Sequence, residues 1–222
     1  MNKLCLLSAV MIAVLVLVSC SQTPQIKDNA EVLDNGLIKV SHARFDNVYV
    51  RTGIDFKKFD NIIVEPLNLA DLEVTLQRYH GRRMNWELTD KDRTYFAATY
   101  RDAMVDKLSN QGEYHLASHI TASSAIVKGK LIELVPYQDK RNLADDSSPN
   151  YSYGSSPGIM EIQYEVLDFN GNLLATMQDR REAGNNTAMQ QQHIMRSSTD
   201  VKQLFQLWAD MVRTGFDRAL KK

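Results

Sequence analysis

Two histidines are the first candidates for metal chemistry in this chain. His115 and His119 lie four residues apart, a spacing that puts two imidazoles on one face only in a helix. The surrounding segment, residues 114–119, is typical of a strand or loop, and no glutamate lies between the histidines. We therefore interpret both as surface or partly buried imidazoles and predict no metal site.

The sequence gives little support for catalysis by a carboxylate pair or by a serine nucleophile. Glu161 and Glu165 share one face of an expected strand, where four residues separate them by roughly 13 Å, whereas paired glycosidase carboxylates lie about 5–9.5 Å apart. Residues 154–158, Gly-Ser-Ser-Pro-Gly, imitate a serine nucleophile elbow, but proline precedes the second glycine and the context is not strand-turn-helix. No phosphate-binding or dinucleotide loop is present. The sequence therefore predicts no catalytic residue and no cofactor.

Two arginines and three tyrosines form a candidate binding surface. Arg180 and Arg181 could grip an anionic group, although pairing of Arg180 with Glu161 across a hairpin explains that arginine without a ligand. Amphipathic tyrosines around the polar loop 138–157 suit recognition of a peptide, glycan or protein surface. These are Tyr137, Tyr151 and Tyr153. The alternative is that their placement reflects loop composition alone.

Cys20 is the residue whose chemistry the sequence specifies best. It follows a positive start, an apolar run from Leu4 to Val18, and the order Leu17-Val18-Ser19-Cys20, which looks like the lipobox of bacterial lipoproteins. These features predict an export signal, residues 1–19, that is removed. The Cys20 thiol can then carry lipid, and two or three acyl chains hold a protein durably at about 0.8 kcal/mol per buried methylene. The alternatives are an ordinary cleaved signal or an uncleaved anchor helix.

The expected location is the outer membrane, with the protein lipid-anchored and facing the periplasm, because Ser21 rather than aspartate follows the cysteine, as in exported lipoproteins generally. Residues 20–44 are polar and predict a lipidated N-terminus and flexible tether. Residues 45–222 predict a single periplasmic α/β domain. Cys5 leaves with the signal, so this domain has no thiol for a disulfide.

Charge argues against a nucleic-acid partner. The chain has 26 Lys and Arg against 27 Asp and Glu, and no basic cluster stands out. The expected partners are the membrane, through the lipid on Cys20, and an envelope protein or cell-wall component.

The strands are predicted from β-branched runs and turn residues. Residues 48–50 suggest a short strand, residues 61–67 a firm one buried on both faces, and residues 114–116 another short one. Residues 125–135 predict a longer strand, in which Gly129 suggests a β-bulge.

Two long helices are predicted from apolar residues at spacings of three and four. The first begins after Thr89, a good N-cap, and stops near Gly112. The second begins near Ser198 or Thr199. Its polar face carries mixed charges rather than the basic face of a membrane-surface helix, so we expect it to pack on the domain's own sheet.

The pair Asn170-Gly171 predicts a two-residue type I′ hairpin. Closing that turn pairs Val166 with Ala175 and Tyr164 with Met177 on an apolar face. The opposite face pairs Glu165 with Thr176, Gln163 with Gln178, and Glu161 with Arg180. A slip of one residue would invert both faces, although Ile162 opposite Asp179 fits this register less well.

The predicted fold class is α+β, a two-layer α/β sandwich: a mostly antiparallel sheet of about four or five strands with two long helices packed on one face. The chain also resembles the domain-of-unknown-function family numbered 3313, a group of bacterial lipoproteins. The resemblance rests on residues 54–66, Tyr100-Arg101-Asp102-Ala103, the hairpin from Glu165 through Gly171, Asp179-Arg180-Arg181 and Trp208-Ala209. It implies a small α/β lipoprotein domain and brings no catalytic residues.

Three functions remain open from the sequence. The leading hypothesis is a non-catalytic binding or scaffolding module of the cell envelope. The others are an envelope hydrolase with an unrecognised site and a subunit of a secretion or transport assembly. An enzyme predicts a pocket that gathers titratable side chains, whereas a binding module predicts a groove, sheet edge or apolar patch without them.

Overall fold

The protein is described from a computed structural model. The described residues are 23–76, 78–79, 82–83, 87–112, 114–136, 157–182 and 197–221. Cys20, the signal segment and the three candidate tyrosines lie outside these residues. So do residues 138–156 of the polar loop.

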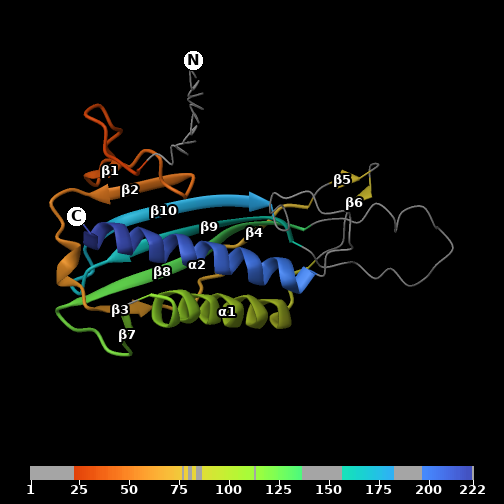
Figure 1. The fold of residues 1–222 in the computed structure, drawn as a ribbon. Coiled ribbons are helices and arrows are strands. Elements are labelled where there is room, and N and C mark those ends of the chain that lie inside the picture. Colours follow the sequence, from red (N-terminus) through yellow and green to blue (C-terminus); the bar gives the residue numbers. More distant parts are fainter. Residues whose placement is uncertain are drawn as a thin grey trace, which may run out of the picture.

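Among the described residues, one mixed sheet of eight strands dominates the fold (Figure 1). Along the sheet the strands run in the order β1-β2-β10-β9-β8-β3-β7, and β4 pairs with β8 off this path. Their bounds are Leu37–Lys39 for β1, Asn47–Arg51 for β2, Asn61–Val64 for β3, Glu73–Val74 for β4, His115–Leu116 for β7, Ser124–Pro136 for β8, Pro157–Leu167 for β9 and Leu173–Glu182 for β10. Two further strands, β5 (Arg78–Tyr79) and β6 (Arg82–Arg83), pair with each other.

The predicted sheet of four or five mostly antiparallel strands is wrong. The observed sheet is antiparallel from β1 to β8, but β3 runs parallel to both of its neighbours, β8 and β7, and β4 is also parallel to β8. The reason is the connection. Helix α1 lies between β3 and the next strands of the sheet, β7 and β8, in the chain. The connection is therefore a β-α-β crossover, and strands joined in this way run parallel.

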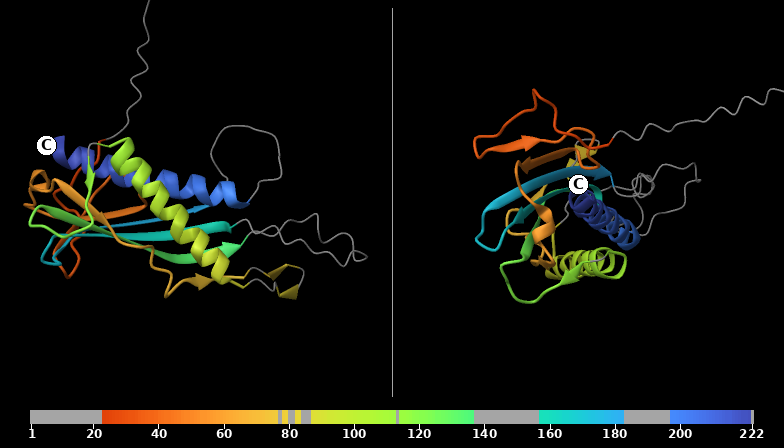
Figure 2. Two further views of the ribbon diagram at one scale, coloured as in Figure 1. Left: turned by 90° about the horizontal axis from the view of Figure 1, so that it is seen from below. Right: turned by 60° about the vertical axis from the view of Figure 1, so that its left-hand side comes forward.

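The two predicted helices are present, and both cover the same face of the sheet (Figures 1 and 2). Helix α1 spans Asp90–Val105 and continues as a π-helical turn, Asp106–Asn110. Thr89 is its N-cap: its hydroxyl accepts from the Asp92 N–H at 3.2 Å, and the Asp92 carboxylate accepts from the Thr89 N–H at 3.0 Å. This reciprocal capping box explains why the helix begins where the sequence predicted.

Helix α2 spans Ser197–Lys221 and buries a continuous apolar stripe against the sheet. The buried stripe consists of Val201, Leu204, Phe205, Trp208, Ala209, Met211, Val212 and Phe216. The prediction that this helix packs on the domain's own sheet is therefore confirmed. In the described part of the chain, no helix is long and apolar enough to cross a membrane.

The β9–β10 hairpin has the predicted register but a different turn. All the predicted pairs are observed, from Val166 with Ala175 to Glu161 with Arg180. Asn170 has no positive φ, however, and Gly171 alone occupies the left-handed region, at φ 82°, with its N–H donating to the Asp168 carbonyl. A three-residue loop therefore replaces the type I′ turn. A register shift between Leu173 and Ala175 restores the predicted pairing.

Gly129 does not mark a bulge. It pairs regularly with Tyr164, and the irregularities of β8 lie further along, between Leu131 and Glu133 and at Pro136. A Cβ at Gly129 would lie 2.7 Å from the Tyr100 hydroxyl and 2.8 Å from a ring carbon. Glycine is required here because the Tyr100 ring packs directly on the strand backbone.

The sheet begins inside the segment for which we expected a flexible tether. Strand β1 lies within residues 20–44 and pairs with β2, and Leu37 is fully buried. Gln25 also bridges to Ser41. Hydrogen bonds between backbone groups thus order a polar segment that offers little apolar periodicity.

Candidate functional site

The two candidate arginines lie on opposite faces of β10. Arg180 is on the face that the helices leave uncovered, where its Nε lies 2.9 Å from Glu133 and 3.7 Å from Glu161. Glu161 is its cross-strand partner, as the hairpin register predicted. Arg180 is therefore neutralised by two carboxylates within the sheet.

Arg181 points to the helix-covered face and pairs with Asp179. One of its terminal nitrogens also donates to the backbone carbonyl of Arg44 at 3.2 Å. Because alternate residues of a strand face opposite ways, Arg180 and Arg181 do not converge on one ligand. Each contributes to holding the structure together.

Asp179 is the centre of a buried polar cluster. The residue is 1% exposed, and its carboxylate accepts from the Trp208 indole Nε1 at 2.7 Å and from the Asp46 N–H at 3.2 Å. The carboxylate therefore joins β10, α2 and the segment that enters β2. In the predicted register a charged residue, Asp179, is paired with the apolar Ile162. The structure shows that Asp179 faces the core, where buried N–H groups donate to its carboxylate.

A second charged network ties the segment before β2 to α2. Arg44 donates to Asp210 at 2.7 Å and to the Thr214 hydroxyl at 3.1 Å. Arg213 donates to Asp210 and Asp217, each at 2.7 Å. Partial burial alone would raise the pKa of Asp210, but the hydrogen bonds from Arg213 and Arg44 outweigh it and lower that pKa from its ordinary value.

An apolar cavity of about 160 Å³ lies beside these two networks, between the C-terminal half of α2 and the sheet. Its walls come from the segment before β2, from β2, β9 and β10, from the short helix Phe56–Lys58, and from α2. The lining residues are Pro24, Val40, Ala43, Arg44, Phe45, Val48, Val50, Phe56, Val166, Ala175, Met177, Met211, Val212, Thr214, Gly215, Phe216, Arg218 and Ala219.

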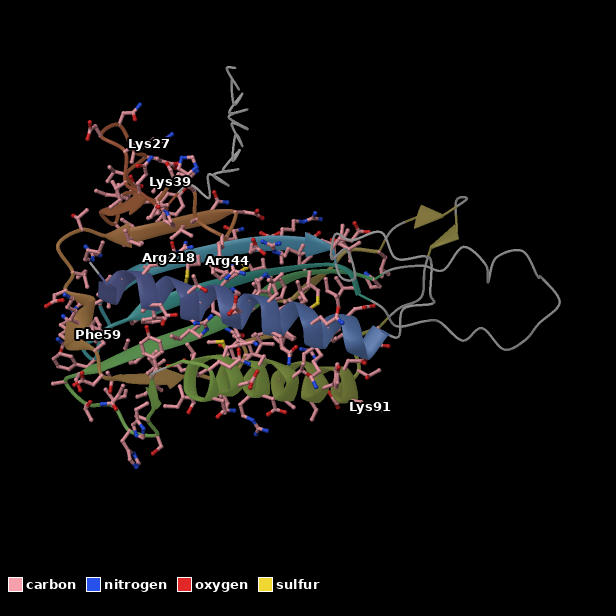
Figure 3. All side chains as sticks on the ribbon, viewed as in Figure 1. Lys27, Lys39, Arg44, Phe59, Lys91 and Arg218 are labelled. Carbon is pink, nitrogen blue, oxygen red and sulfur yellow. The ribbon has the colours of Figure 1, made fainter. Side chains whose placement is uncertain are left out.

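The polar atoms of the cavity belong to a threonine and two arginines. Arg44 is held by Asp210 and Thr214, as described above. Arg218 is exposed and, among the described residues, has no hydrogen bond or ion pair. Figure 3 labels both arginines: Arg218 belongs to α2, and Arg44 belongs to the segment before β2 and lies beside the same helix. The lining includes no histidine, cysteine, serine, tyrosine or carboxylate. The cavity can hold an apolar group near a cation, and its one hydroxyl among the described lining residues, that of Thr214, has no base beside it in this lining.

Two tyrosines are buried in the core close to this region. The rings of Tyr100 and Tyr164 stack with centroids 6.3 Å apart, and within the described part of the chain neither hydroxyl has a hydrogen-bond partner. Burial raises the pKa of both hydroxyls above the ordinary value. Both tyrosines therefore stay protonated at neutral pH and pack as core residues.

The two candidate histidines do not form a site. His115 lies on β7, His119 follows in the loop, and both side chains are exposed. The described residues include no group of three or more His, Cys, Asp or Glu side chains that could hold a metal ion.

Sequence reasoning missed the cavity because its walls come from segments that lie far apart in the chain, from Pro24 to Ala219. Signals did exist. Val40 and Phe45 are apolar residues beside a polar segment, and Gly215 interrupts the apolar stripe of α2 without a steric reason, since a Cβ there meets nothing within 4 Å. A small residue opposite apolar residues leaves space, but only the fold shows that these residues face one another.

The fold and the cavity together define a two-layer α/β domain with a mixed sheet and an apolar pocket under its C-terminal helix. Residues 29–212 match the model of the family described as "Protein of unknown function (DUF3313)", so the chain belongs to that family, as the resemblance indicated. No curated protein matches the chain. The chain is also similar to a solved structure described as "Crystal structure of uncharacterized protein", with 7% sequence identity and a TM-score of 0.34. The matched region covers 72% of this chain and 92% of the other.

Proposed function

We propose that this protein is a lipid-anchored outer-membrane lipoprotein facing the periplasm, and that its domain is a non-catalytic binding module for an envelope component. The anchor is the lipid on Cys20. The ligand site is the apolar cavity beside α2. The observation that carries the binding role is the lining of this cavity, which is apolar apart from Thr214 and two arginines.

The lining favours binding over catalysis for a chemical reason. Acyl transfer and hydrolysis need a nucleophile or activated water next to a base. The one hydroxyl among the described lining residues, that of Thr214, donates to the Asp210 carbonyl at 2.7 Å, and no histidine, carboxylate, lysine or cysteine among these residues could serve as its base. Apolar walls gain free energy by excluding water from an apolar ligand, and a few polar groups orient it. The cavity meets these requirements of a binding site.

The position of the first described residues supports a short connection to the membrane. Pro24 lines the cavity, and Gln25 is bridged to Ser41. Pro24 follows Cys20 by four positions, and at most about 3.6 Å per position this stretch spans roughly 14 Å. A lipid on Cys20 therefore places this end of the domain close to the bilayer surface, nearer than a tether ending at residue 44 would.

Mass spectrometry of the mature N-terminus tests the anchor. In a Gram-negative host, the full chain is expected to begin at Cys20, to carry acyl groups and to sediment with outer membranes. Cys20→Ala is expected to lose all three properties. Cys5→Ala is the matched control, because Cys5 lies in the removed signal and its loss should change none of them. An unacylated mature terminus, or acylation unaffected by Cys20→Ala, contradicts the proposal.

A further inference from the structure

We propose that the cavity beside α2 binds the alkyl chain of a free fatty acid, with the carboxylate held at Arg218. This inference rests on the proposed function and gives the chemical class of the envelope component. The argument uses the size of the cavity, the composition of its walls and the charge at its mouth.

The size of the cavity fits part of an alkyl chain. Its volume is about 160 Å³, and an apolar protein cavity of about 150 Å³ is large enough for benzene. Roughly six carbon atoms are therefore accommodated. In a longer acid the last carbons fill the cavity, and the methylenes next to the carboxylate lie at the mouth beside the exposed Arg218. A macromolecular segment with polar backbone groups does not suit these walls, because its backbone would lose its hydrogen bonds there.

The walls combine rigid and adaptable side chains. Phe45, Phe56 and Phe216 supply aromatic surface, and Met177 and Met211 supply flexible thioethers that adjust to different chain positions. All except Phe56 are buried residues of the hydrophobic core, so the cavity lies next to the core. An alkyl chain in it replaces missing packing contacts.

The charge at the mouth selects an acid. Arg218 lines the cavity, is exposed, and has no partner among the described residues. Arg44, the second arginine, is already neutralised by Asp210 at 2.7 Å. The net charge at the mouth is therefore positive, and it complements a carboxylate on a ligand whose tail lies in the cavity. A neutral alcohol of the same length gains the apolar contacts without this pairing.

The segment before β2, which covers one side of the cavity, is fixed in place by hydrogen bonds at Arg44. Arg44 belongs to the segment that covers the cavity, and its bonds to Asp210 and Thr214 attach this segment to α2. Arg181 donates to the Arg44 carbonyl from the other side. The cover is thus preorganised, which lowers the entropic cost of binding.

Photolabelling of the full chain in phosphatidylcholine nanodiscs tests the proposal. The probes are decanoic acid and decan-1-ol, each with a diazirine near the last carbon. Label from the acid is expected on cavity residues such as Met211 and Phe216, about fivefold more than from the alcohol, and is expected to be displaced by unlabelled decanoate. Label spread over exposed apolar residues such as Ile26 and Ile120, or equal labelling by acid and alcohol, would overturn the proposal.

Two matched pairs of variants locate the site. Arg218→Glu is expected to abolish the preference for the acid, whereas Lys202→Glu, the same charge change at an exposed position of α2 outside the cavity, should leave it intact. Gly215→Phe is expected to fill the mouth and reduce labelling at least tenfold, whereas Gly215→Ala should not. Circular dichroism checks that each variant is folded. Unchanged labelling in both Arg218→Glu and Gly215→Phe refutes the site.

Peptide mass spectrometry of the photolabelled protein tests the lipid anchor and the fatty-acid site independently. The mass of the Cys20 peptide reports acylation, and the label on Met211 reports ligand binding. Acylated protein without cavity label refutes the fatty-acid site alone, and labelled protein without acylation refutes the anchor alone. Cavity label that appears only in Cys20→Ala shows that the protein's own lipid occupies the cavity, which would overturn a free fatty acid as the ligand.

Discussion

The indole Nε1 of Trp208 donates a 2.7 Å hydrogen bond to Asp179, and both side chains are buried. This bond connects the longest helix to the sheet. The same carboxylate pairs with Arg181 on its own strand and accepts from the Asp46 N–H, so one acidic side chain joins three segments of the fold: β10, α2 and the segment before β2.

Asp179→Ala is expected to lower the free energy of unfolding by about 3–5 kcal/mol, because it leaves the buried Trp208 indole N–H without an acceptor and removes the carboxylate that pairs with Arg181. Urea unfolding followed by circular dichroism measures this change. Asp102→Ala is the matched control: Asp102 is exposed and pairs only with its neighbour Arg101, so the change should be about 0.5 kcal/mol or less. Equal effects of the two substitutions would contradict the central role of Asp179.

Gly129→Ala is expected to destabilise the protein by about 1–3 kcal/mol, because the new Cβ would lie under 3 Å from the buried Tyr100 ring. The measurement is again the urea midpoint at constant slope. Combining Gly129→Ala with Tyr100→Leu should cost less than the sum of the two single changes. Strict additivity would show that the contact between strand and ring is not the cause.

Gly215→Ala is expected to have the opposite sign and to stabilise the protein by about 0.5–1 kcal/mol. Gly215 lies inside α2, a Cβ there meets nothing within 4 Å, and glycine is a poor helix former. Thermal unfolding should show a higher midpoint. A loss of stability would mean that the open space at this position has a structural role.

Asp210→Asn is expected to reduce the acid sensitivity of the fold. The folded-state pKa of Asp210 is lowered below the ordinary value of 3.8, so its ionised form stabilises the protein above about pH 4, and this contribution is lost as the pH falls through the lowered pKa. The variant should be roughly 1–2 kcal/mol less stable than wild type at pH 7, and the difference should shrink towards pH 2. A difference that is constant from pH 7 to pH 2 would contradict this assignment.

Local features of the fold were predictable where neighbouring residues determine them. The Thr89 N-cap, the apolar stripe of α2 and the β9–β10 register follow from periodicity and from pairs close in sequence. The turn type was missed because a register shift after Leu173 compensates for a three-residue loop, and two different turns thus give the same pairing downstream. The family membership was also readable from short motifs.

The candidate site was only partly predictable. The sequence suggested that the neighbours Arg180 and Arg181 could bind one anionic group. Because alternate residues of a strand face opposite ways, the two side chains lie on opposite faces of β10, and each pairs with a different carboxylate. The cavity is bounded by Pro24 at one end of the chain and Ala219 at the other. No local pattern relates residues so far apart.

By itself the sequence determined the two helices, the main hairpin and the order of apolar and polar faces, because these depend on side chains within a few positions of one another. Tertiary structure alone decided that β3 runs parallel to β8, that β1 joins the sheet, and that an apolar cavity remains under α2. Short strands have little pattern of their own, and unfilled space is a property of surfaces that meet only after folding.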